Sequence, residues 1–156
     1  MTVVDVKSIL IAYRDTERYI DVQIERLELL EAKIESVGSP TLSDMPKPPS
    51  PSVDRIAEMA QRKVDLEAKI KRLMQEQAFV RSRIEKATEE LPDKMQRTVI
   101  QTRYLDREKW DTINFMIFGG EADYADKADS YMRRIMILHG QALEKLAEIY
   151  EADRSL

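Results

Sequence analysis

The sequence has no cysteine, only one histidine (His139) and only four glycines among its 156 residues. The lack of cysteine excludes a disulfide scaffold, a cysteine-ligated zinc site and a thiol nucleophile. One histidine gives little basis for a histidine metal centre or a Ser-His-Asp triad. Few glycines and 6% aromatic residues disfavour a β-sandwich, which needs many turns and aromatic or β-branched strands. We therefore expect an all-α protein.

Long apolar runs are also missing. No stretch approaches the roughly 18 apolar residues that a membrane-spanning helix needs. The segment from Met1 to Lys7 lacks the basic start and apolar core of a secretion signal. We expect a soluble, cytoplasmic protein that does not bind membranes.

Charge of one sign is not in excess. The chain has 25 basic and 29 acidic residues, a net charge of −4, and neither half is strongly basic. Nucleic-acid binding would therefore need a local basic surface. Nothing in the sequence selects one catalytic pair among the many carboxylates, and the acidic run 121–129 lacks calcium-loop spacing. We expect no enzyme activity, no small-molecule substrate, no metal and no other cofactor.

Five of the six prolines lie between Pro40 and Pro51. Proline has no amide donor and disfavours a helical conformation in the residue before it, so this run cannot be helical. Gly38, just before the run, suits the end of a helix. We interpret residues 38–52 as a stiff connector inside an N-terminal domain that spans residues 1–91.

Two apolar tracts with alternating spacings of three and four flank this connector. Such heptads are typical of coiled-coil seams. The seam residues are Val6, Leu10, Tyr13, Ile20, Ile24, Leu27 and Ile34 in the first tract, and Ile56, Met59, Leu66, Ile70, Leu73, Val80, Ile84, Ala87 and Leu91 in the second. Each tract also has two polar seam positions: Glu17 and Glu31 in the first, Lys63 and Gln77 in the second.

A register test favours an antiparallel hairpin. If the chain folds back on itself, facing residues have a nearly constant sum of residue numbers. Leu10 with Ile84, and Val6 with Ala87, satisfy this rule, and the same register pairs Glu17 with Gln77 and Glu31 with Lys63. Polar breaks that face one another help to fix a register. A parallel homodimer, or two helices packed on the C-terminal part without a coiled coil, remain alternatives.

The C-terminal part, residues 92–156, has shorter apolar patterns. Pro92 suits the first turn of a new helix, and MQRTVIQTRYL (95–105) and WDTINFMIF (110–118) predict two short helices. Gly119 and Gly120 end the second helix. A polar stretch, residues 121–129, precedes a long amphipathic helix over residues 130–153, in which Ile135, Leu138, Ala142, Leu146 and Ile149 face inward. This succession outlines a helix-turn-helix domain.

The succession TVIQTRYLDREKWDTI, a glycine break and RRIMILHGQALEKL resembles region four of bacterial sigma factors, which reads promoter DNA. More specifically, the chain resembles the ArpU/RinA-type late transcriptional regulators of phages. The sigma-like part covers residues 92–156. The resemblance implies a helix-turn-helix whose last helix enters the major groove of double-stranded DNA, with RNA polymerase as a further partner and the host bacterial cytoplasm as the location.

Carried over residue by residue, the resemblance implies seven DNA-binding positions near the start of the last helix: Ser130, Tyr131, Arg133, Arg134, Met136, Ile137 and His139. Arg133 and Arg134 have the strongest physical case, because a guanidinium can bind guanine or phosphate with two parallel hydrogen bonds. Ser130 would cap the helix. Phosphate contacts are expected from Lys94, Arg97, Arg103, Arg107 and Lys109. His139 also fits a second interpretation, as a partly buried or surface residue of that helix.

Two functions follow as hypotheses. In the first, the chain is a DNA-binding regulator that forms homo-oligomers, or contacts RNA polymerase, through its N-terminal helices. In the second, it is a coiled-coil adaptor or phage assembly protein whose helix-turn-helix-like end binds protein. Met136 and Ile137, which are apolar where base-reading residues are expected, favour the second hypothesis.

Overall fold

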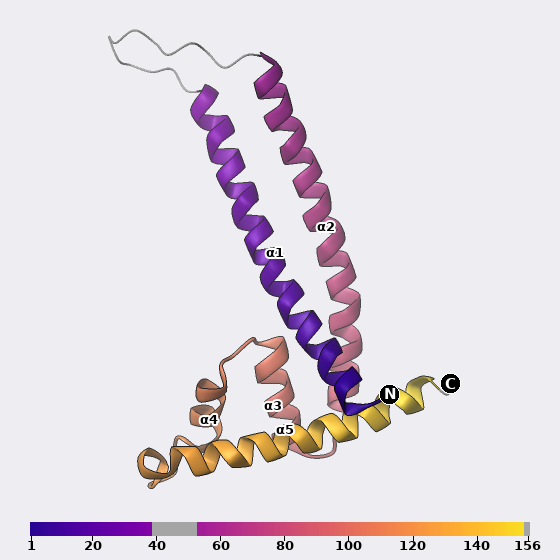
Figure 1. Ribbon diagram of the computed structural model, residues 1–156, viewed down its shortest axis with the longest axis vertical. Coiled ribbons are helices and arrows are strands. Elements are labelled where there is room, and N and C mark those ends of the chain that lie inside the picture. Colours follow the sequence, from indigo (N-terminus) through magenta and orange to yellow (C-terminus); the bar gives the residue numbers. More distant parts are fainter. Residues whose placement is uncertain (39–52, 155–156) are drawn as a thin grey trace. The chain divides into compact units, whose positions relative to one another are not determined.

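The computed structural model describes residues 1–38 and 53–154, and within these ranges all regular structure is helical. Two long helices, α1 (Val3–Gly38) and α2 (Val53–Glu89), come first in the chain (Figure 1). They are followed by α3 (Lys94–Ile100), a short π-helical turn η1 (Gln101–Leu105), α4 (Trp110–Phe118) and α5 (Tyr124–Arg154). The predicted all-α class is confirmed. Apart from Gly38, which ends α1, the predicted connector 38–52 lies outside the described residues.

The start of α1 has a defined cap. The Thr2 hydroxyl accepts a hydrogen bond from the Asp5 amide, and the Asp5 carboxylate accepts one from the Thr2 amide. This reciprocal arrangement satisfies two amides that have no partner inside the helix. The hydrogen bond from the Thr2 backbone amide is also the main cause that lowers the pKa of Asp5.

The two long helices run antiparallel within one chain, so the predicted antiparallel hairpin is confirmed. The register prediction holds at its most informative point, because Gln77 Nε2 donates to Glu17 Oε1 at 3.2 Å. We call the end of the hairpin formed by the start of α1 and the end of α2 its base. Near this base, Arg81 donates to the Tyr13 hydroxyl at 3.2 Å. Lys63 forms its ion pair with Glu67 of its own helix, at 3.8 Å.

The chain divides into two compact units. One consists of residues 1–16 and 78–156, and the other of residues 17–77. The predicted boundary at 91/92 lies inside the first unit, because Leu91 packs in the same core as Val6, Leu10 and Ile84. In the second unit α1 and α2 pair along a narrow seam in which Ile20 and Ile70 are buried.

The core of the first unit consists of two clusters of buried side chains. One cluster joins the seam residues at the base of the hairpin to Ile100, Tyr104 and the buried face of α5. A second cluster centres on Val99, Ile113 and Ile135. Four of the five α5 residues expected to face inward are buried, and Leu138 packs against the second cluster. The amphipathic pattern of this helix therefore predicted its packing.

The connections between the short helices have local causes. Asp93 caps α3 by accepting hydrogen bonds from the amides of Met95 and Gln96. Pro92 therefore lies before the helix, and its predicted place in the first turn is wrong. After α4, Gly119 is needed for space, because a Cβ there would lie 2.3 Å from the carbonyl oxygen of Phe115. The predicted end of this helix at the two glycines is confirmed.

Across residues 1–38 and 53–154, none of the helices combines the length and the apolar character needed to span a bilayer.

Candidate nucleic-acid interface

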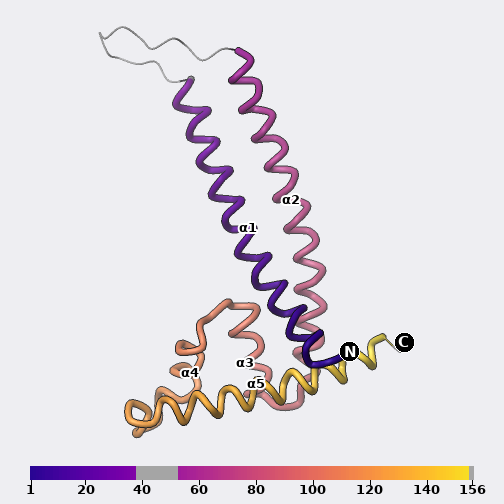
Figure 2. The backbone as a smooth tube through the Cα atoms, viewed as in Figure 1, coloured from indigo at the N-terminus to yellow at the C-terminus, as the bar shows by residue number. Residues whose placement is uncertain are grey.

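The candidate site lies on α5, which packs against both α3 and α4. Figure 2 follows the backbone from α4 through the turn at Gly119 into α5. Ile135 is fully buried against Val99 of α3 and Ile113 of α4. This packing fixes which side of α5 faces outward.

The outward side of α5 carries the predicted pair of arginines. Ser130, Arg133, Arg134 and Ile137 are all exposed, whereas Ile135 and His139 are buried on the opposite side. With 3.6 residues per turn, positions three and four apart share one helix face. The four exposed residues therefore form one continuous surface, which we call the α5 face.

The two guanidinium groups are not neutralised. Within residues 1–38 and 53–154, neither Arg133 nor Arg134 forms an ion pair. The Arg134 guanidinium carbon lies 4.7 Å from the ring centroid of Phe118 and 5.7 Å from that of Tyr131. Stacking on a ring positions a guanidinium and leaves its N–H edge available for hydrogen bonds. Arg134 is therefore held in place and still able to bind an anion.

Phe118 and Tyr131 belong to a larger aromatic cluster that the sequence did not predict. Phe118 stacks on Tyr131 with ring centroids 4.8 Å apart, Tyr131 stacks on Tyr124 at 6.0 Å, and Tyr124 meets the edge of Phe115 at 5.8 Å. The cluster ties α4 to the start of α5. A signal was present, since Phe115 and Phe118 are three apart and Tyr124 and Tyr131 seven apart, but the pairing requires the turn at Gly119.

The start of α5 differs from the prediction. The helix begins at Tyr124 and not at Ser130, and it is kinked at Lys127, whose φ and ψ of −122° and 23° are not helical. Ser130 therefore lies within the helix, and its predicted role as a cap is wrong. The polar stretch 121–129, which was expected to precede the helix, is helical from Tyr124 onward, and the Tyr124 ring packs against Phe115 and Tyr131.

One carboxylate of that stretch is already engaged. The Tyr131 hydroxyl donates to Asp123 Oδ1 at 2.5 Å, and Lys127 Nζ lies 3.4 Å from Asp123 Oδ2. The hydrogen bond from Tyr131 is the main cause that lowers the pKa of Asp123, and the same bond raises the pKa of Tyr131. Tyr131 is thus half-buried, and its hydroxyl is hydrogen-bonded inside the protein. It helps to position the α5 face and is not one of its exposed residues.

His139 lies in the core. It is 7% exposed, and its Nε2 atom is hydrogen-bonded to the Tyr104 hydroxyl at 2.8 Å. Its ring meets the Trp110 ring edge-on at 4.9 Å. Burial lowers the pKa of His139 to about 4, so the ring is neutral at pH 7. This environment does not support the prediction of DNA contact by His139, and the ring is more buried than its second interpretation, as a partly buried or surface residue, expected.

The five predicted phosphate contacts fall into two groups. Lys94, Arg107 and Lys109 are exposed, and Arg107 has a φ of 60° in the turn before α4. Arg97 and Arg103 instead support the backbone. Arg97 donates to the Leu91 carbonyl at 2.7 Å, and Arg103 donates to the Glu108 carbonyl at 3.0 Å with its guanidinium 4.6 Å from the Trp110 ring centroid.

Exposed apolar side chains lie on the same two helices. Phe115 is 63% exposed and Ile137 58% exposed, and Met116 and Met136 are also exposed. Large exposed apolar side chains are common at protein-binding surfaces, and Ile137 can also meet a thymine methyl group. The exposure of these four side chains favours a protein partner.

The part of the chain that the structure describes contains no group of three or more His, Asp or Glu side chains placed to hold a metal ion. Comparison with known proteins found no matching protein-family model, no matching curated protein and no matching solved structure.

Proposed function

We propose that the chain is a DNA-binding transcription regulator of the phage ArpU/RinA type, with α4 and α5 serving as a sigma-like helix-turn-helix. The observation that carries this proposal is the α5 face, where Arg133 and Arg134 are adjacent, exposed and unpaired among the described residues. Two cations on one turn of the exposed face of α5 suit the phosphates and guanine edges of a major groove. The helix order short, short, long is consistent with that docking mode.

In this proposal Arg134 contacts the DNA with a side chain whose position is already fixed in the free protein. Its stack on Phe118 limits the conformations of the side chain, so less entropy is lost when it binds a base or phosphate. Arg133, for which the described residues provide no stacking partner, contacts the phosphate backbone of the DNA. Lys94, Arg107 and Lys109 add phosphate contacts where they face the same duplex.

The proposal includes an oligomer or a polymerase contact through α1 and α2. One small helix-turn-helix contacts few bases, and specific binding is usually reached by pairing two half-sites or by a partner bound nearby. RNA polymerase in the host bacterial cytoplasm is the partner that the sigma-like resemblance suggests.

A fluorescence-anisotropy titration tests the proposal, with labelled duplexes from promoter regions of the genome that encodes the chain. Binding should weaken roughly tenfold or more for each fourfold rise in salt, as expected for two or more phosphate contacts. The double variant Arg133→Ala/Arg134→Ala should lose at least tenfold in affinity. The matched control is Lys71→Ala/Arg72→Ala, which removes the same charge from two exposed positions on α2. Equal losses in both double variants would argue against a site on α5.

A second candidate function is a coiled-coil adaptor or phage assembly protein. The exposed side chains of Phe115, Met116, Met136 and Ile137 favour it. If this function holds, Ile137→Glu, which adds a charge beside these apolar side chains, should abolish binding of the protein partner. Replacing Arg133 and Arg134 should then have little effect on that binding. If the chain binds no duplex even at low salt, this second function replaces the first.

A further inference from the structure

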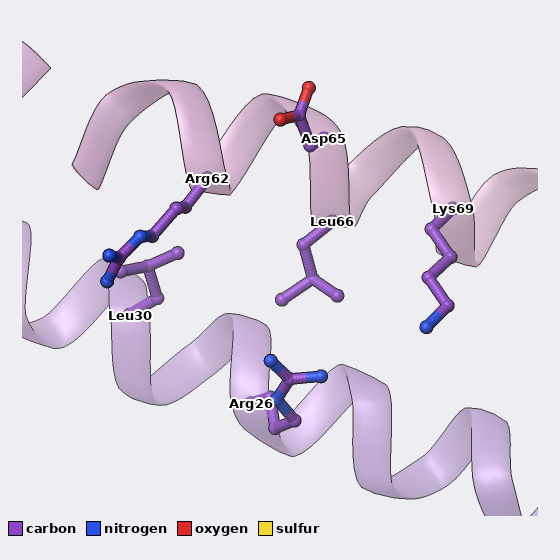
Figure 3. Close-up of a pocket in the computed structure, with 6 residues that line it drawn as sticks. All are labelled: Arg26, Leu30, Arg62, Asp65, Leu66 and Lys69. Carbon is purple, nitrogen blue, oxygen red and sulfur yellow. The ribbon is translucent and has the colours of Figure 1, made fainter. Parts of the chain in front are cut away.

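In the second compact unit, a groove between α1 and α2 is lined by several positively charged side chains. It has a volume of about 360 Å³, and Figure 3 shows its six lining residues: Arg26, Leu30, Arg62, Asp65, Leu66 and Lys69. Arg26 extends from α1 toward α2, whereas Arg62 and Lys69 extend from α2 toward α1 (Figure 3). Three cations from two helices therefore share one gap.

Among the described residues, none of these three cations forms an ion pair with a carboxylate. Arg26 donates to the neutral Gln23 side chain at 2.7 Å, and Lys69 donates to the Tyr19 hydroxyl at 2.6 Å. Within the described residues Arg62 has no polar partner. The single acidic residue of the lining, Asp65, accepts a hydrogen bond from Gln61 at 2.9 Å, and its carboxylate points away from α1 (Figure 3).

The groove continues toward the end of the hairpin. A second hollow, of about 310 Å³, shares Leu30 and Arg62 with the first and adds Lys33, Arg55, Glu58 and Met59. At 1.5 Å per residue, the stretch of α2 from Met59 to Lys69 measures about 15 Å, or nearly three helical turns. Both hollows together offer an elongated surface with more cations than carboxylates.

The floor of this surface is apolar. Leu30, Leu66 and Met59 are only half-buried, so the pairing of α1 with α2 leaves part of each side chain in water. A nucleic-acid backbone would use the cations and leave this floor wet. A peptide that carries acidic and apolar side chains uses both, since its apolar side covers the floor while its carboxylates meet the cations.

We propose that this groove binds an acidic, amphipathic segment of a partner protein, about three helical turns long, with Arg62 at its centre. Arg26 and Lys69 bind carboxylates at one end of the segment, and Leu30, Leu66 and Met59 receive its apolar side chains. Charge complementarity selects the partner, because within residues 1–38 and 53–154 Arg26, Arg62 and Lys69 form no ion pair with a carboxylate. The proposal does not depend on DNA binding by α5.

The test is a binding titration of the full chain with a labelled synthetic peptide of about 14 residues, made of Glu and of Leu at helical spacing. Two competitors accompany it: oligoglutamate of equal charge and a short DNA duplex. The amphipathic peptide should bind at least tenfold more tightly than oligoglutamate, and Arg26→Glu/Arg62→Glu should weaken its binding at least tenfold. Lys71→Glu/Arg72→Glu makes the same charge change at exposed positions outside the groove and should bind as the wild type does.

The neutral variant Arg26→Gln/Arg62→Gln guards against misfolding, and its circular-dichroism spectrum should match that of the wild type while its peptide affinity falls at least fivefold. Three outcomes would overturn the proposal: no peptide binding, equal affinity in the groove and control variants, or DNA binding that depends on Arg26 and Arg62 and displaces the peptide.

Discussion

Arg134 and His139 are five residues apart on α5 and have opposite environments. Arg134 is exposed and stacks on Phe118, while His139 is buried and bonded to Tyr104. The difference follows from helical geometry, since residues five apart lie on different sides of a helix that has one buried face. The first residue is suited to a ligand, and the second holds η1 and α4 against α5.

We predict that His139 makes the protein sensitive to mild acid. Its pKa is near 4 in the folded chain, because burial disfavours the charged ring, and its ordinary value is 6.5. The unfolded chain therefore binds the proton first, and this stability is complete above pH 6.5 and lost as the pH falls toward 4. The expected loss from this one group between pH 7 and pH 4 is about 3 kcal/mol.

Urea denaturation of the wild type and of His139→Gln at pH 7 and pH 4 measures this effect. Glutamine keeps a hydrogen-bonding side chain near Tyr104 and does not titrate. The variant should be less stable than the wild type at pH 7 and should lose less stability on acidification. An identical loss in both proteins would mean that His139 does not titrate in this range.

We also predict that the stack on Phe118 matters for Arg134. In Phe118→Leu the apolar packing is largely kept while the aromatic face under the guanidinium is lost. Because a cation–π contact contributes roughly 0.5–1 kcal/mol at exposed sites, DNA affinity should fall by about twofold to fivefold. The anisotropy titration measures this change. The effect should vanish in an Arg134→Ala background, and a persistent effect would show that Phe118 acts in another way.

At the scale of elements, the hairpin depends on a seam with polar interruptions. Glu17 and Gln77 face one another at 3.2 Å, between apolar pairs on both sides. A slip of one heptad would bring each of these side chains against an apolar partner and leave a polar group without its bond. The polar pair thus selects one register among several that the apolar residues alone would accept.

The register leads to a crosslinking prediction that the lack of native cysteine makes simple to read. Cysteines at Leu10 and Ile84, both buried in one cluster at the base of the hairpin, should join within one chain under mild oxidation. Gel electrophoresis without reductant should show a monomer of altered mobility. Leu10→Cys paired with Leu73→Cys, displaced along the seam, is the control that should not close. A ladder of covalent dimers from the first pair would contradict the intramolecular hairpin.

Most of the helices could be predicted from the sequence, because the signals for them are local. Heptad spacing, the break at Pro92 and the two glycines after Phe118 predicted the helices because each depends on neighbours in the chain. The start of α5 was missed because Tyr124 is held by Phe115 and Tyr131, contacts that form only after the turn at Gly119. The burial of His139 was left open for a similar reason, as its partner Tyr104 is 35 residues away.

At the scale of the whole molecule, the two compact units differ in how much they bury. The unit with residues 1–16 and 78–156 contains two clusters of buried side chains. In residues 17–38 and 53–77 the buried positions are few and include the polar residues Gln23 and Gln77. Stability that comes from apolar burial is therefore concentrated in the first unit.

Native-state hydrogen exchange should show this difference. Amides of residues 24–37 and 53–66 should exchange earlier than those around Ile100 and along residues 139–150, because fewer buried contacts hold the former closed. Mass spectrometry of peptic fragments resolves these segments. Uniform protection along α1 and α2 would contradict the prediction and indicate that the long helices open together with the core.

Crosslinking from the α5 face itself tests whether this face contacts DNA. With no native cysteine, Ile137→Cys gives a single attachment point, 58% exposed in the wild type, for a benzophenone photo-crosslinker. The labelled chain is irradiated in host-cell extract with added promoter-region duplexes. We expect a protein–DNA adduct that disappears at high salt and in the Arg133→Ala/Arg134→Ala background. Adducts with protein alone, unchanged by the loss of both arginines, would contradict this expectation.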